Sequence, residues 1–175
     1  MKVRTTPKVA LVGASMLVAA AIWALGSGAQ AASETRVCTW GGTPANPTGV
    51  VTLDPGATNT PSSSPSKLHA WGPLEGDGCQ GTMTFQGIAK AGSGCRFSTF
   101  EGRVKGVPGV ARFDGAGSGP FVSEYLYDSD GNVVGADQPV LKAFGAGDRF
   151  SDGLDCNTPE GYTRGLFSAT VELYN

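Results

Sequence analysis

Four cysteines are the residues of this chain best suited to chemistry: Cys38, Cys79, Cys95 and Cys156. A redox pair or a zinc site needs closely spaced cysteines such as C-x-x-C, and zinc sites commonly add histidines. No such pair occurs, and His69 is the only histidine. An even number of widely spaced cysteines instead predicts two structural disulfides. We therefore expect no metal site and no cofactor.

Carboxylates offer two other kinds of chemistry. The segment Asp128–Asn132 alternates oxygen-bearing side chains as calcium loops do, but an EF-hand loop needs its glycine sixth and a glutamate twelfth. Here the glycine is fourth and Pro139 is twelfth, so a tight turn centred on Asp-Gly is the favoured interpretation and calcium the alternative. Glu101 and Glu172 lie in expected strands and are the pair that a carboxylate-based hydrolase would use, although most strand glutamates are solvated.

Other catalytic and binding patterns are weak. No serine lies in a G-x-S-x-G motif, and alternation places His69 on a partly exposed strand face. Trp40 and Trp71 are the main candidates for stacking against a sugar, with Phe97 a weaker one. Tryptophan is more often a core residue, and Trp40 lies two residues from Cys38. These weak patterns favour a protein that is not an enzyme, and they identify no catalytic residue.

The elements that position these residues are short β-strands. Segments rich in Val, Thr, Phe and Tyr alternate with clusters of Gly, Pro, Asp and Asn, which is typical of an all-β domain. The pattern predicts one antiparallel β-barrel or β-sandwich of about eight or nine strands. We expect the strands at Arg36–Trp40, Gly49–Leu53, Lys67–Trp71, Thr82–Ala89, Arg96–Lys105, Val110–Asp114, Phe121–Tyr127, Asn132–Gly135 and Thr163–Tyr174, with loops at Pro55–Ser66 and 142–159.

Three Phe-x-Gly triplets, which begin at Phe85, Phe100 and Phe113, predict a three-stranded meander. Because side chains alternate along a strand, the Phe and Gly of each triplet share one face, which we expect to form core. A four-residue turn at 91–94 pairs Phe85 with Phe100. A second turn centred on Gly106-Val107 pairs Phe100 with Phe113 and avoids two opposed arginines.

The first of these hairpins also predicts the disulfide pairing. Cys95 lies at its turn end, whereas Cys79 lies at its open end, roughly 35 Å away along a strand. A disulfide needs Cα atoms within about 7 Å of each other. Cys38 and Cys79 flank the expected 55–66 loop and would meet at the open end of another hairpin. We therefore predict the pairs Cys38–Cys79 and, by elimination, Cys95–Cys156.

The N-terminal segment predicts export. Three basic residues precede an apolar run from Val9 to Leu25, and Ala29-Gln30-Ala31 forms a small-x-small cleavage site. We expect residues 1–31 to be a secretory signal peptide and residues 32–175 to be the mature all-β domain. The run is shorter than a typical membrane-spanning helix, so we expect a secreted protein with no stable membrane insertion of the mature chain.

Charge narrows the choice of partners. Three of the 13 basic residues and none of the 15 acidic residues precede the expected cleavage site, which leaves 10 basic against 15 acidic residues in the mature domain. Binding to nucleic acid by counterion release needs a basic surface. We therefore expect no nucleic-acid partner.

Four short segments carry a resemblance: Cys38–Gly42, Pro55–Pro61, Gly78-Cys79 and Phe100–Gly106. In them the chain resembles secreted, disulfide-containing, β-rich proteins of high-GC Gram-positive bacteria. The segments are scattered over roughly the first half of the mature domain. The resemblance implies secretion and an all-β fold, and because that group has no assigned activity it implies nothing about function.

Three functions fit these expectations. The first is a non-enzymatic extracellular protein that binds a partner or a surface. The second is a β-barrel that binds a small apolar ligand, with the glycine-rich Phe face lining its interior. The third is a secreted hydrolase that uses strand carboxylates. A filled core, an apolar cavity or two carboxylates across a cleft would distinguish the three.

Overall fold

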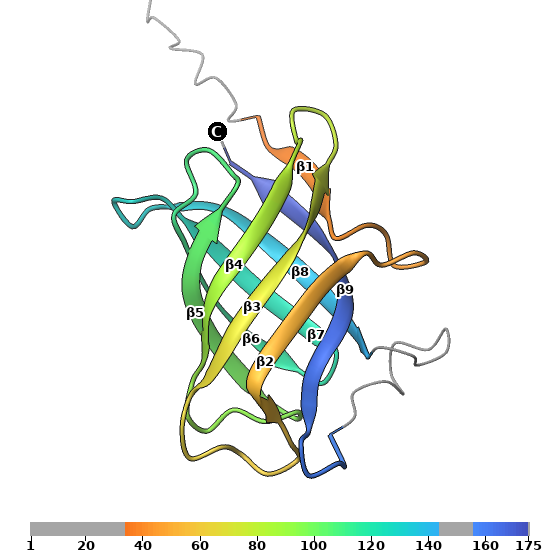
Figure 1. Cartoon of the computed structure of the whole chain (residues 1–175). Coiled ribbons are helices and arrows are strands. Elements are labelled where there is room, and N and C mark those ends of the chain that lie inside the picture. The colour runs from red at the N-terminus through yellow and green to blue at the C-terminus, as the bar shows by residue number, and fades with distance from the viewer. Residues whose placement is uncertain (1–33, 144–155, 175) are drawn as a thin grey trace, which may run out of the picture. The chain divides into compact units, whose positions relative to one another are not determined.

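The computed structural model describes residues 34–143 and 156–174, and these residues form nine β-strands and no helix (Figure 1). The expected signal peptide lies outside the described residues. Within the described part of the chain, no helix is long and apolar enough to cross a membrane. The strands are β1 (Arg36–Trp40), β2 (Gly49–Ala57), β3 (Ser66–Glu75), β4 (Thr82–Ala89), β5 (Ser98–Lys105), β6 (Arg112–Ser118), β7 (Phe121–Tyr127), β8 (Val133–Ala143) and β9 (Tyr162–Leu173).

Eight of these strands close into an antiparallel barrel. From β2 to β9 each strand pairs with the next one in the chain, and β9 pairs back to β2. The extra strand, β1, pairs with the C-terminal half of β9 and with the end of β3. It therefore lies in line with β2, which pairs with the N-terminal half of β9. Of the two expected architectures the structure is the barrel, which leaves no long unpaired strand edge.

Three strands have the expected bounds, and most others are longer or shifted. The largest difference is β8, which continues from the expected end at Gly135 to Ala143 through Asp137 and Pro139. Both residues are rare in isolated strand patterns. They are retained in β8 because β9 is long enough to pair with this strand from Gly135 to Ala143.

One part of the barrel is filled by aromatic side chains. Trp40 contacts Phe85 and Phe167 at ring-centroid distances of 4.4 and 4.3 Å, and Phe85 stacks on Phe113 at 4.2 Å. The indole N–H of Trp40 donates a hydrogen bond to the Met83 carbonyl at 3.0 Å. Because Trp40 is 1% exposed, the sugar-stacking hypothesis is wrong for this residue, and its role is core packing.

The three Phe-x-Gly triplets face the core as expected, but their expected registers are wrong. In β4 and β5 the partner of Phe85 is Val104, and Phe100 lies opposite Ala89. The expected four-residue turn is a longer loop, because the backbone N–H groups of Gly92 and Cys95 donate to carbonyls of Ser62 and Thr58. These bonds tie the loop to the chain that follows β2 instead of to the hairpin.

The second turn of the meander is centred on Val107-Pro108, so Arg103 lies opposite Arg112 after all. Two contacts explain why this register is tolerated. The Arg112 guanidinium lies over the Tyr127 ring, 5.1 Å from its centroid, which is a favourable cation–π contact. A Cβ on Gly102 would come within 2.7 Å of the Phe113 ring, so that glycine provides the space for the ring.

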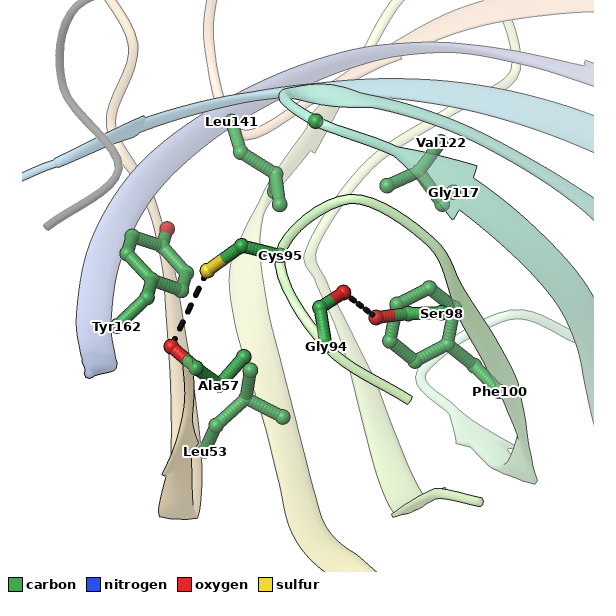
Figure 2. A pocket seen from close by; sticks show the side chains of 11 residues that line it. Leu53, Ala57, Gly94, Cys95, Ser98, Phe100, Gly117, Val122, Leu141 and Tyr162 are labelled. Atoms are coloured by element: carbon green, nitrogen blue, oxygen red, sulfur yellow. Dashed lines mark hydrogen bonds between the residues drawn. The ribbon is translucent and has the colours of Figure 1, made fainter. Parts of the chain in front are cut away.

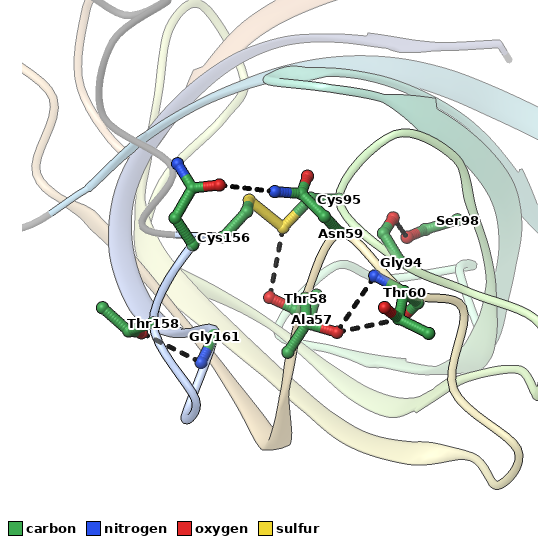
Figure 3. Close-up of a disulfide and its surroundings, with 11 residues drawn as sticks. Ala57, Thr58, Asn59, Thr60, Gly94, Cys95, Ser98, Cys156, Thr158 and Gly161 are labelled. Carbon is green, nitrogen blue, oxygen red and sulfur yellow. Dashed lines mark hydrogen bonds between the residues drawn. A yellow bond between two sulfur atoms is a disulfide. The ribbon is translucent and has the colours of Figure 1, made fainter.

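Two disulfides staple the barrel at its two ends. Cys38 joins Cys79 beside the β3–β4 turn, and Cys95 joins Cys156 beside the β4–β5 loop, which are the pairs expected from the sequence. Figure 3 shows the second bridge, where the Asn59 side chain donates to Asn157 at 2.7 Å. Two intramolecular disulfides indicate folding in an oxidising, non-cytosolic environment.

Candidate functional site

An apolar cavity lies inside the barrel, beside the part filled by aromatic residues. Its volume is about 50 Å³, which is space for a few atoms and far below the several hundred Å³ of a drug-sized site. We call it the inner cavity. Two of its lining residues are polar, Glu124 and Tyr162, and the others are Val51, Leu53, Leu68, Phe100, Val122, Pro139 and Leu141.

A second space of about 30 Å³, the mouth cavity, continues the inner cavity towards the Cys95–Cys156 bridge. The two share lining residues from five strands, among them Leu53, Val122 and Leu141, whose side chains point inward in Figure 2. Gly94 and Cys95 border the mouth cavity, and the Cys95 sulfur lies 3.1 Å from the Ala57 carbonyl oxygen. The loops tied to the second disulfide therefore form one end of this internal space.

Outside the same bridge lies an open surface hollow of about 590 Å³, bordered by Cys95, Gly119, Phe121 and Asn157 among others. Cys95 and Gly119 border both this hollow and the mouth cavity. A molecule that passes from the surface to the inner cavity at this end must therefore pass these two residues. Among the described residues that border the hollow there is no carboxylate.

Two carboxyl groups lie together in the barrel wall, turned inward. On β7, alternation places Val122, Glu124 and Leu126 inside, and on β8 it places Asp137 inside. The β7–β8 register sets Glu124 directly opposite Asp137, a position at which Cβ atoms are about 5 Å apart. Glu124 is 5% exposed and Asp137 is 1% exposed. The structure therefore buries an acidic pair with Glu124 facing the inner cavity.

Burial determines the protonation of this pair. Loss of water raises the pKa of Glu124 well above its ordinary value, and the neighbouring Asp137 carboxylate raises it further. Burial likewise raises the pKa of Asp137, to about 7. Two carboxylates this close repel one another. A proton held between them turns that repulsion into a hydrogen bond, so the pair retains a proton near neutral pH.

Polar atoms beside the cavity lack partners. Apart from the proton shared with Glu124, no described residue donates a hydrogen bond to the Asp137 carboxyl, and the buried Tyr162 hydroxyl has no partner among these residues either. Burial raises the pKa of Tyr162, so its hydroxyl stays neutral. Leaving such groups unpaired costs about 1 to 3 kcal/mol each. A bound molecule that supplies hydrogen-bond donors to this region would recover part of that free energy.

Glycine in the third Phe-x-Gly triplet positions Glu124. Gly115 lies opposite Glu124 in the β6–β7 register. A Cβ on Gly115 would lie 2.5 Å from Cγ of Glu124 and 2.4 Å from the Ser123 carbonyl oxygen, so no larger residue fits there without movement. The Glu124 side chain packs over this bare backbone, which holds its carboxyl inside the barrel.

The carboxylates that sequence reasoning singled out lie elsewhere. Glu101 and Glu172 are both exposed on the outer face, on β5 and β9, which are not neighbours in the barrel. Glu101 forms an ion pair with Lys90. The structure therefore does not bring this expected hydrolase pair together. It brings together Glu124 and Asp137, which the sequence reasoning missed.

The Asp128–Asn132 segment and His69, the remaining candidates from the sequence, make contacts that stabilise a turn and an outer strand face. The Asp128 carboxylate accepts hydrogen bonds from the backbone N–H groups of Asp130 and Asn132 and from the Asn132 amide, which lowers its pKa. That geometry is the expected turn. His69 stacks on Trp71 on the outer face, at a centroid distance of 4.6 Å. Among the described residues no three His, Cys, Asp or Glu side chains gather closely enough to hold a metal ion.

Comparison of the chain with family models, with curated proteins and with solved structures finds no match. We therefore infer the function from the site itself. Its defining features are a buried acidic pair, an unpartnered tyrosine hydroxyl and an apolar cavity in one end of a closed barrel.

Proposed function

We propose that this protein is an exported, non-enzymatic binding protein that holds a small, mainly apolar molecule inside its barrel. The inner cavity carries the proposal: apolar side chains from several strands surround a space whose polar groups are Glu124 and Tyr162. Binding sites for small molecules commonly combine apolar walls with a few convergent polar groups. Export is supported by the signal-like N-terminus and by the two disulfides.

The size of the cavity limits the ligand. About 50 Å³ accommodates a few non-hydrogen atoms, so the buried part of the ligand is small. A longer molecule would extend through the mouth cavity and past Cys95 to the surface hollow. We therefore propose a ligand whose polar end enters first and whose apolar body occupies the space between Leu53, Val122 and Leu141.

Filling the cavity tests the proposal. Val122 lines both internal spaces, so Val122→Phe is expected to occupy the ligand's volume and to abolish binding of small alcohols and amines of about four carbons. Binding is measured by NMR titration of the oxidised protein. Val37→Phe makes the same substitution on the exposed face of β1, where the side chain is 58% exposed, and is expected to leave binding unchanged.

Val122→Leu serves as a second, milder variant, since its added methylene reduces the volume with less disturbance of the fold. A graded loss of affinity from wild type through Val122→Leu to Val122→Phe supports an internal site. Equal binding by all three proteins, or no binding of any probe by the wild type, would overturn the proposed function.

A further inference from the structure

We propose that the ligand carries a protonated amine, whose ammonium group binds Glu124 in the inner cavity. This inference rests on the proposed function and specifies the chemical class of the ligand. The charged groups inside the barrel are acidic. Glu124 lies opposite Asp137, and none of the described residues that line the two internal spaces is Lys, Arg or His.

The charges that act most strongly on Glu124 are the carboxylates of Asp137 and Asp114. Asp114, on the neighbouring strand β6, adds a third carboxylate that disfavours ionisation of Glu124. On β9 the residue opposite Asp137 is the apolar Val171, and the neighbouring Glu172 faces outward. A buried acidic pair without a cation is costly, and it is stabilised either by keeping a proton or by gaining a positive charge. An ammonium ion supplies that charge together with hydrogen-bond donors.

The donors and acceptors match in kind. An ammonium group on a primary amine has three N–H donors and no acceptor. Glu124 provides carboxyl oxygens that accept from it, and the Tyr162 hydroxyl, which has no partner among the described residues, lies nearer the mouth cavity. The face of Phe100, which lines the same cavity, adds a surface that attracts cations. A carboxylate or phosphate ligand would instead meet like charge and be excluded.

Binding has a defined proton balance. Near neutral pH the pair holds a proton and an alkylamine is already protonated. When the ammonium reaches Glu124, the carboxylate form is favoured and the pair's proton leaves to solvent. No bond to carbon forms or breaks, and the amine keeps its own proton. One proton is therefore released for each amine bound, whereas a neutral alcohol of the same length releases none.

The test compares n-butylamine with n-butanol on the full, oxidised protein at pH 7, with NMR titration for affinity. We expect the amine to bind at least about tenfold more tightly, as a charge-assisted hydrogen bond provides. In Glu124→Gln the shape is preserved and the charge is lost, so butanol should still bind and the amine preference should disappear. The matched control is Glu172→Gln, an equal change at an exposed position on β9, which should keep the preference.

Calorimetry in two buffers of different ionisation enthalpy gives the second readout, because proton release makes the amine's apparent enthalpy depend on the buffer. Equal affinity of the wild type for amine and alcohol, or an amine preference that persists in Glu124→Gln, would overturn this inference and leave the proposed function standing. Failure of both probes to bind would remove the proposed function as well.

Discussion

At the scale of single residues, the most unusual feature of this protein is the buried acidic pair of Glu124 and Asp137. Both carboxyls are inside the barrel, opposite each other, and in the described part of the chain no basic side chain lines the adjoining cavity. Their protonation is therefore coupled to the fold and to any ligand. Structural carboxylates are usually paired with cations or solvated, and this pair is neither.

The acidic pair predicts an unusual dependence of stability on pH. Folding raises the pKa of both carboxyls, so above about pH 4 the unfolded chain releases protons that the folded chain keeps. The free energy of unfolding should therefore fall as pH rises from about 4 through about 7, the pKa of Asp137 in the fold. The contribution of Asp137 corresponds to about 3 kcal/mol less stability at pH 8 than at pH 5.

Denaturant unfolding of the oxidised protein at several pH values measures this slope. The double variant Glu124→Gln, Asp137→Asn keeps the shapes and removes both titrations, so its curve should be flatter and its stability at pH 8 higher than that of the wild type. Glu172→Gln is the matched control on the outer face. A wild type as stable at pH 8 as at pH 5 would contradict the buried, proton-holding pair.

At the scale of strands, the Phe-x-Gly triplets show how far local pattern reaches. Alternation correctly places Phe85, Phe100 and Phe113 in the core. Alternation does not determine the register, because shifting one strand of a hairpin by two residues keeps the same side chains on the inward face. The first expected turn rests on the four-residue segment 91–94, and the second rests on like-charge avoidance and aromatic pairing. Backbone hydrogen bonds to a distant loop and the fit of Phe113 over Gly102 determine the actual registers.

Gly115, on β6, is a position where even one added methyl group should destabilise the barrel. Gly115→Ala is expected to destabilise the barrel by about 2 to 3 kcal/mol, because the new Cβ would collide with the Ser123 carbonyl and with Glu124. Gly117→Ala, on the same inward face of β6, meets its nearest atom, a Val122 methyl carbon, at 3.0 Å and should cost less than about 1 kcal/mol. Denaturant midpoints of the two variants make the comparison, and equal losses would refute the crowding argument.

At the scale of the whole molecule, the barrel is held by closure and by one covalent staple at each end. Cys38–Cys79 closes a separation of 41 residues and Cys95–Cys156 one of 61 residues. In the loop-entropy model each contributes about 4 kcal/mol by restricting the unfolded chain. The first bridge is also part of the core, with both cysteines almost fully buried.

Removing each disulfide by paired Cys→Ala substitution should therefore lower the free energy of unfolding by about 4 kcal/mol. The Cys38/Cys79 variant should lose more than the Cys95/Cys156 variant, because it also leaves space beside the buried Trp40 cluster. Denaturant unfolding of the two double variants at one pH provides the measurement. A Cys95/Cys156 variant as stable as the wild type would show that this bridge does not restrain the fold.

The acidic pair shows why the site was not predictable from the chain. On β7 one face carries Phe121 and Tyr125, and the other carries Val122 and Glu124. Hydrophobicity favours turning the aromatic face inward, yet in the structure Phe121 is 65% exposed and Tyr125 is 55% exposed. Asp137 lay beyond the expected end of its strand. If β8 is predicted to continue to Ala143, Asp137 falls within the strand and can lie beside Glu124.

The all-β class, the inward face of the Phe-x-Gly strands and the pairing of the four cysteines are predictable from the chain alone. They follow from alternation, composition and the reach of a strand, which are properties of short segments. The closure of the sheet into a barrel, its registers and the inward face of β7 depend instead on contacts between distant segments, which no short segment specifies. Closure joins β9 to β2 across most of the chain, and the acidic pair beside the apolar cavity exists only once that ring of strands is complete.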